Sequence, residues 1–131
     1  MSDVKVVRAL LVASTTLIAA VPALKIVAGA VPEGTAMPAI GVTHVGRNWG
    51  KDISRQSTWV VARTQVTVMA SSYPEQKRLI DLVLAAIPRR PGVVSGVKVD
   101  NIARESGGPD FEDEAANIYM QTQDFMVAYN E

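Results

Sequence analysis

The clearest pattern in the chain is an alternation of side chains over Thr58–Ala70. Every second position is apolar or threonine, and the positions between them mix aromatic, charged, amide and apolar side chains. Successive side chains of a β-strand point to opposite faces of its sheet, so this period of two predicts a long strand with one apolar and one mixed face. The predicted apolar face consists of Val60, Ala62, Thr64, Val66, Val68 and Ala70.

Two other segments repeat their apolar positions with the period of an α-helix. The first can be capped by Asp3 and is ended by Pro22, and its basic and threonine side chains lie opposite its leucines and valines. The second, Pro74–Ile87, follows serines that can cap it and stops before Pro88. Both are predicted to be amphipathic helices that pack on a sheet.

The remaining segments predict shorter strands and two polar loops. We expect strands at Lys25–Ala28, Met37–Val45, Val93–Arg104 and Asn117–Tyr129, a polar loop at Arg47–Ser57 and an acidic loop at Gly107–Glu114. Strands and long helices do not alternate, which argues against a doubly wound parallel sheet. The predicted fold class is α+β: a mostly antiparallel sheet of about four to five strands with two helices packed on one face, in a single domain spanning residues 1–131.

The N-terminal segment also imitates a secretory signal peptide, because Lys5 and Arg8 precede an apolar run and small residues. The helical projection argues against that interpretation, since a signal sequence has no reason to separate its threonines from its leucines. The apolar stretch is also too short and too interrupted to cross ~30 Å of hydrocarbon. We therefore expect a docked structural helix and no membrane association.

Composition and charge narrow the class of protein. Hydrophobic residues make up 48% and charged residues 20%, as in folded globular proteins, and the absence of cysteine excludes disulfides and thiolate metal sites. The net charge of zero gives no global attraction to nucleic acid or anionic membranes. Yet Met1–Arg104 holds thirteen basic and six acidic residues, a net +7, and Glu105–Glu131 holds seven acidic residues and no base, a net −7. The chain can present complementary surfaces to its own copies, or the charges can be two solvated faces.

Few side chains could support catalysis or bind a metal. His44 is the only histidine, and it is in step with the apolar positions of an expected strand, which favours a structural or interface role over a nucleophilic centre. The acidic run Asp110–Glu114 lacks the spacing of a calcium loop, and Gly29–Gly34 lacks the pattern of a phosphate-binding loop. We predict no catalytic residue, no metal, no cofactor and no enzymatic activity.

Two clusters are better candidates, for contacts with other chains. The predicted interface residues are Arg47, Trp49, Lys51, Arg55 and Trp59 in a basic segment and Asp110, Phe111, Glu112, Asp113 and Glu114 in an acidic segment. Trp and Arg are enriched at protein interfaces, although basic and aromatic residues together also bind nucleic acid, and Trp59 could simply cover the sheet. With zero net charge we prefer a protein interface, in which the basic segment of one subunit meets the acidic segment of the next.

The order of elements resembles the tail completion, or tail terminator, proteins of long-tailed phages and prophages. The resemblance rests on the early helix, the turn Gly29–Pro38 leading into a strand, the Thr58–Ala70 strand, the Pro74–Ile87 helix and the ending Tyr119–Tyr129, in which Gln123-Asp124-Phe125 stands between two tyrosines. It implies a structural virion protein, made in the host bacterial cytoplasm, that forms a ring, typically a hexamer, on the head-proximal end of the tail tube. The implied ring ends tube polymerisation and provides the head-tail joining surface.

The resemblance also implies the partners: copies of the chain itself, the major tail tube protein and head-tail connector proteins, with DNA only as passing cargo in the lumen. Three other functions stay open. One is a different neck protein, such as a connector or stopper. Another is a small-molecule-binding or enzymatic domain that uses the mixed sheet face near His44 or Arg63, and the third is nucleic-acid binding through Arg47–Arg63.

Overall fold

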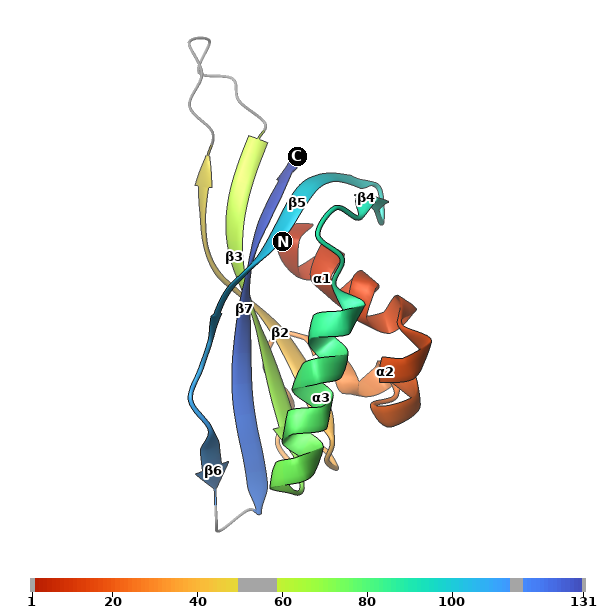
Figure 1. Ribbon diagram of the computed structural model, residues 1–131, viewed down its shortest axis with the longest axis vertical. Coiled ribbons are helices and arrows are strands. Elements are labelled where there is room, and N and C mark those ends of the chain that lie inside the picture. The colour runs from red at the N-terminus through yellow and green to blue at the C-terminus, as the bar shows by residue number, and fades with distance from the viewer. Residues whose placement is uncertain (1, 50–58, 114–116, 131) are drawn as a thin grey trace.

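A computed structural model describes residues 2–49, 59–113 and 117–130 of the chain, and these residues form helices and one sheet (Figure 1). The helices are α1 (Ser2–Ala13), α2 (Thr15–Ala20), the short 3₁₀ helix η1 (Ala23–Lys25) and α3 (Tyr73–Ala86). The strands are β1 (Ile26–Ala28), β2 (Ala39–Trp49), β3 (Trp59–Ala70), β4 (Gly92–Val94), β5 (Val97–Gly107), β6 (Phe111–Asp113) and β7 (Ile118–Asn130). None of these helices is long and apolar enough to span a membrane.

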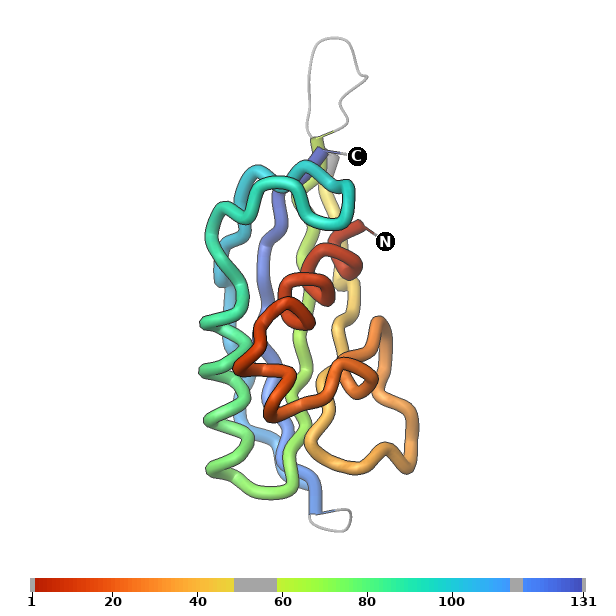
Figure 2. Tube along the Cα trace, turned by 90° about the vertical axis from the view of Figure 1, so that its right-hand side faces the viewer, coloured from red at the N-terminus to blue at the C-terminus, as the bar shows by residue number. Residues whose placement is uncertain are grey.

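The α+β class is confirmed, and the sheet is mostly antiparallel. Its strand order is β1-β2-β3-β7-β5-β4, with β6 paired to β7, and only the β1–β2 pair is parallel among the described strands. The central strands β3 and β7 pair from Trp59 opposite Asn130 to Ala70 opposite Tyr119. The helices lie on one side of this sheet, and the other side is left without a helical layer in the described parts of the chain (Figures 1 and 2).

The expected strand count was too low, because the described residues form seven strands. The segment expected as one strand over Val93–Arg104 is a hairpin, since Ser95 and Gly96 both adopt positive φ angles, 50° and 82°, and reverse the chain between β4 and β5. The acidic segment expected as a loop also contributes a strand. Phe111–Asp113 pairs with the start of β7, and this long-range pairing overrides the low strand propensity of acidic residues.

The first helix also differs from its expectation in two details. It is interrupted at Ser14, whose extended backbone ends α1 and whose hydroxyl accepts a hydrogen bond from the backbone N–H of Leu17 at 3.3 Å, which caps α2. Asp3 does not cap α1 from outside, because it lies in the first turn of α1 and its side chain is completely buried. That carboxylate has a different role, described below.

The core lies between the helices and the apolar face of β3 predicted from the alternation. Burial along β3 alternates strictly, and Val60, Val66 and Val68 are completely buried. The amphipathic helices supply the opposite wall, through Leu11 and Leu17 at the N-terminus and α3 further along the chain. Burying an aliphatic side chain of this size stabilises the fold by about 1.5–3 kcal/mol, so this contact holds the helices on the sheet.

A close backbone approach closes the turn between β1 and β2. The backbone N–H of Gly29 donates to the carbonyl of Val42 at 2.7 Å, so the turn lies directly over β2. A Cβ atom on Gly41 would lie 2.8 Å from the carbonyl oxygen of Gly29 and 3.3 Å from a methyl group of Val31. Only glycine fits at position 41 without displacing this turn.

We therefore expect Gly41→Ala to lower the free energy of unfolding by about 1–3 kcal/mol, since the added methyl group clashes with backbone that must shift. The matched control is Gly46→Ala on the same strand, where a Cβ atom meets nothing within 4 Å. Chemical denaturation of the two variants measures the difference. Equal stabilities would contradict the close approach.

Candidate functional site

The described part of the predicted basic segment lies at one end of the sheet. Arg47 and Trp49 occupy the last positions of β2, opposite Ala62 and Val60, and Trp59 begins β3 with 42% of its surface exposed. The structure therefore brings these three predicted residues to the same end of one strand pair. Lys51 and Arg55 lie outside the described residues.

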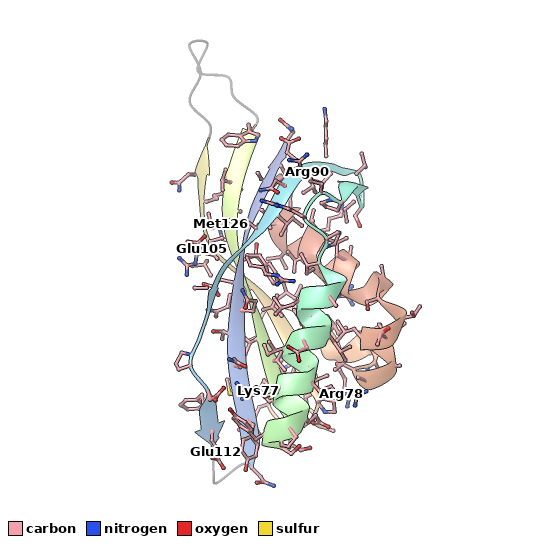
Figure 3. All side chains as sticks on the ribbon, in the orientation of Figure 1. Lys77, Arg78, Arg90, Glu105, Glu112 and Met126 are labelled. Atoms are coloured by element: carbon pink, nitrogen blue, oxygen red, sulfur yellow. The ribbon has the colours of Figure 1, made fainter. Side chains whose placement is uncertain are left out.

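The acidic segment lies at the other end, where it is attached to α3. One oxygen of Asp110 accepts a hydrogen bond from the Tyr73 hydroxyl at 2.8 Å, and the other accepts one from the Lys77 ammonium at 2.5 Å. Lys77 also donates to the side chain of Gln121 on β7 at 3.2 Å. Figure 3 shows Lys77 and Glu112 near this end of the molecule. Asp110 is thus engaged within its own subunit and fixes the segment that leads into β6.

This contact shifts the pKa values of both Asp110 and Lys77. The hydrogen bond from Lys77, and then that from Tyr73, lowers the pKa of Asp110 below its ordinary value of 3.8. The same hydrogen bond raises the pKa of Lys77 above its ordinary value of 10.5. Both side chains are exposed, so solvent screening keeps the effect on stability small.

After Asp110, the segment presents side chains to solvent. Phe111 is 59% exposed and Glu112 and Asp113 are exposed as well, while Glu114 lies outside the described residues. Asp113 makes a further contact within the chain, as do Arg47 and Trp59 in the basic segment, so none of these three is a free side chain. Of the predicted acidic residues, Phe111 and Glu112 are accessible to solvent, and their role in an interface stays a prediction.

The two clusters lie at opposite ends of the molecule. Trp59 and Ala70 are the two ends of β3, which rises about 3.3 Å per residue, so they are separated by roughly 36 Å. β6 pairs with residues 118–120 of β7, which include Tyr119, the partner of Ala70, so β6 lies at the end far from Trp59 (Figure 1). The described residues of the basic and acidic clusters therefore do not meet within one chain, and a contact between them requires a second copy.

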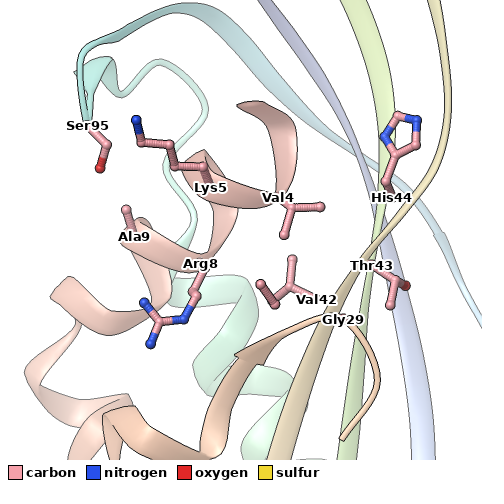
Figure 4. A pocket seen from close by; sticks show the side chains of 10 residues that line it. Val4, Lys5, Arg8, Ala9, Gly29, Val42, Thr43, His44 and Ser95 are labelled. Carbon is pink, nitrogen blue, oxygen red and sulfur yellow. The ribbon is translucent and has the colours of Figure 1, made fainter. Parts of the chain in front are cut away.

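A groove of about 700 Å³ lies between α1 and β2 (Figure 4). It is bounded by Lys5, Arg8 and Ala9 on α1 and by Val42, Thr43 and His44 on β2, with Val4, Ala28, Gly29 and Ser95 completing its lining. The Arg8 guanidinium is held in place by donating to the backbone carbonyls of Ile26 at 2.8 Å and Ala23 at 3.4 Å. The helical projection had placed Lys5 and Arg8 on the polar side of the helix, opposite its leucines, and did not predict the groove. The one signal for it was the spacing of these two basic residues, three positions apart and beside the small Ala9.

Behind this groove, a buried carboxylate fixes α1 to the sheet. Asp3 Oδ2 accepts a hydrogen bond from the Thr64 hydroxyl at 2.9 Å and lies 2.8 Å from His44 Nδ1. Thr64 and Asp3 are fully buried, and His44 reaches them from the lining of the groove, so the contact joins α1, β2 and β3 in one network. Asp3 Oδ1 has no hydrogen-bond partner among the described residues. His44 is therefore engaged by a structural contact.

The uncovered face of the sheet carries a second polar network. Arg63 Nε donates to Asp124 Oδ2 at 2.7 Å, and its Nη2 donates to the Ser106 hydroxyl at 3.0 Å. Beside Arg63 is a shallow hollow of about 400 Å³ with Val45 and Glu105 on its border. The charge of Arg63 is compensated by Asp124, and the other charged side chains on the border of the hollow, Arg47 and Glu105, have opposite signs. No group of three or more potential metal ligands occurs within the described ranges.

Comparisons with known proteins give a consistent assignment. Residues 5–130 match the family described as "Tail completion protein gp17". A chain in the solved structure "Virion of native gene transfer agent (GTA) particle" has a similar fold, with a TM-score of 0.72 and 16% sequence identity. That similarity covers 98% of this chain and 94% of the other. A search of curated proteins found no match to the sequence.

We expect Asp110→Ala to reduce the amide-exchange protection factors of residues 108–113 at neutral pH, because the segment loses its attachment to Tyr73 and Lys77. The lowered pKa of Asp110 means that this contribution is present above the ordinary pKa and is lost as the pH falls through the lowered value. At high pH the limit is set by Lys77. Because its pKa is raised, the contribution of the contact is present below pH 10.5 and is lost as the pH rises through the raised value. The difference from wild type should therefore shrink in strong acid. Asp81→Ala, an exposed change on the same helix, is the control, and equal protection in all three proteins would contradict the attachment.

We expect Thr64→Val, which keeps the shape of the side chain, to lower the free energy of unfolding by about 1–3 kcal/mol because the buried Asp3 carboxylate loses a donor. The control is Thr67→Val on the uncovered face of the same strand, where the hydroxyl is not buried beneath α1. Urea denaturation measures both. A cost for Thr64→Val no larger than that for Thr67→Val would show that the network does not hold α1.

Proposed function

The chain belongs to the tail completion protein gp17 family, and from this we propose that it forms a ring on the head-proximal end of a phage tail tube. As a member of this family it is a structural protein of the virion tail. In the proposal, residues 1–131 act as one domain, the ring ends tube polymerisation, and its outer surface joins the tail to the head. The partners are copies of the chain, the major tail tube protein and head-tail connector proteins, and DNA passes through the lumen.

The observation that carries this proposal is the placement of two different surfaces at opposite edges of one sheet. β1 stops at Ala28, so β2 from Thr43 onward has no strand on its outer side among the described residues. At the other side, the described pairing of β6 is with β7 alone, and its acidic side chains are exposed. An interface between two different patches repeats head to tail, and it closes into a ring when its rotation allows.

The charge distribution supports the same arrangement. The groove edge carries Lys5 and Arg8, and Arg47 lies further along the same strand edge, whereas Glu112 lies on the opposite edge. Complementary charge at the two sides steers copies together and disfavours the contact between like edges. This favours a ring over a twofold dimer. Six copies is the number that the family resemblance implies.

A different neck protein, such as a connector or stopper, is the second candidate. Both functions use the same fold and the same self-association, and they differ in the partner that the ring binds. The test must therefore include the tail tube.

The experiment is assembly of purified tail tube protein with and without this chain, followed by tube lengths in electron micrographs. We expect bound rings at one end of the tubes and a shorter, narrower length distribution, because capped tubes cannot add subunits. Tubes of unchanged length without end-bound rings would contradict the terminator function. Rings that bind a connector complex but not the tube would favour the connector alternative.

A matched pair of variants separates ring formation from general charge effects. Glu112→Lys with Asp113→Lys places positive charge on the acidic edge and should abolish both the rings and the length limit. Glu33→Lys with Asp81→Lys makes the same change in net charge at exposed positions elsewhere and should preserve both. Equal behaviour of the two double variants would contradict the role of the acidic edge.

A further inference from the structure

We propose that the groove between α1 and β2 is the receptor for Phe111 and Glu112 on β6 of a second copy of the chain. This inference rests on the proposed ring and identifies the two surfaces that join neighbouring subunits. It also assigns a different receptor from the basic segment at Arg47–Trp59 that the sequence alone suggested.

The inserted side chain is Phe111, which β6 presents in a fixed position. Its backbone pairs with Met120 of β7, and the preceding residue, Asp110, is attached to Tyr73 and Lys77 of α3. Even so, 59% of the Phe111 surface is exposed. One exposed apolar side chain is ordinary on a protein surface, but an aromatic residue whose backbone is already attached between acidic residues needs little further ordering of the chain on binding.

The receptor has room for this anchor and a matching polarity. The groove is open and has a volume of about 700 Å³, and Val4, Ala9 and Val42 give it apolar walls. Its charged groups are basic, namely Lys5 and Arg8, and no acidic side chain lines it among the described residues. Phe111 enters against the apolar wall. Glu112 points to the opposite face of β6, so its carboxylate stays outside this wall and meets the Lys5 ammonium at the rim of the groove.

The backbone of β2 provides a second point of attachment. From Thr43 onward its outer edge is open within the described residues, and an extended segment of another chain can add to such an edge through main-chain hydrogen bonds. The pairing of β2 with β3 shifts register between His44 and Gly46, where Val45 is 53% exposed. This bulge interrupts the strand and limits the length that can be added.

The positions of the groove and of β6 require two copies. The groove lies by the β1–β2 edge of the sheet, and β6 extends from β7 at the far end (Figures 1 and 4). Each chain therefore has one inserted segment and one receptor, which is the requirement for a repeating head-to-tail contact. The receptor is also rigid, since the Asp3 network attaches α1 to β2 and β3.

The decisive experiment exchanges the charges of the two residues. Its readout is the protein concentration at which half of the chains are assembled, measured by native mass spectrometry and in the presence of tail tubes. Lys5→Glu and Glu112→Lys should each raise that concentration about tenfold or more, and the double variant should recover most of the loss, because the two residues form one contact. The controls are Lys98→Glu and Glu105→Lys, exposed changes of the same kind on β5, which should not rescue each other.

A second measurement uses the absence of cysteine from the chain. Any disulfide in a variant must join introduced cysteines. We expect a mixture of the single variants Ala9→Cys and Phe111→Cys to form a covalent dimer on oxidation, while neither variant alone does. Replacing Phe111→Cys with Val93→Cys, at a position that is 72% exposed on β4, should give no dimer with Ala9→Cys.

The outcomes separate this inference from the ring itself. If the wild type forms rings but the charge exchange gives no recovery and the mixed cysteine variants give no dimer, the receptor is wrong and the ring stands. Recovery of Glu112→Lys by Arg47→Glu in place of Lys5→Glu would overturn the groove in favour of the far end of β2. If the wild type forms no ring, either alone or on tubes, the proposed function fails and this inference fails with it.

Discussion

The pairing of β3 with β7 is the constraint on which the rest of the structure depends. Twelve positions pair in one unbroken register, and β3 buries one face under the helices along its whole length. A slip of one residue would turn Val60, Val66 and Val68 toward solvent and bring Arg63 under α1, so the apolar pattern specifies the register. The same register places Trp59 at one end of the molecule and β6 at the other, which separates the basic and acidic clusters.

Much of this arrangement can be predicted from the sequence because it depends on periodicity. The alternation over Thr58–Ala70 gives the buried face of β3 position by position, and the helical period gives the packing side of α1 and α3. These are strong signals, since each residue adds to the same pattern. The family resemblance follows from the order of the same elements, and residues 5–130 match that family.

The features that the sequence could not supply depend on long-range contacts or on backbone conformation. The hairpin at Ser95 requires a positive φ that a serine seldom adopts, and the β6 strand exists only because β7 lies beside it. Asp3 is a residue type that caps helices, but its position against β2 and β3 gives it partners 41 and 61 residues away, the half-buried His44 and the buried Thr64. The groove between α1 and β2 is likewise formed by segments that share no local pattern.

These features together describe a subunit with one rigid sheet and two unlike edges, which is the geometry that the proposed head-to-tail ring requires. The most direct test of this account is native mass spectrometry of the purified 14.0 kDa chain over a range of concentrations, alone and on tail tubes. The account predicts one closed species of more than two copies, which electron micrographs show as a ring. A species that stops at a dimer would contradict it, because a twofold dimer pairs like edges with each other.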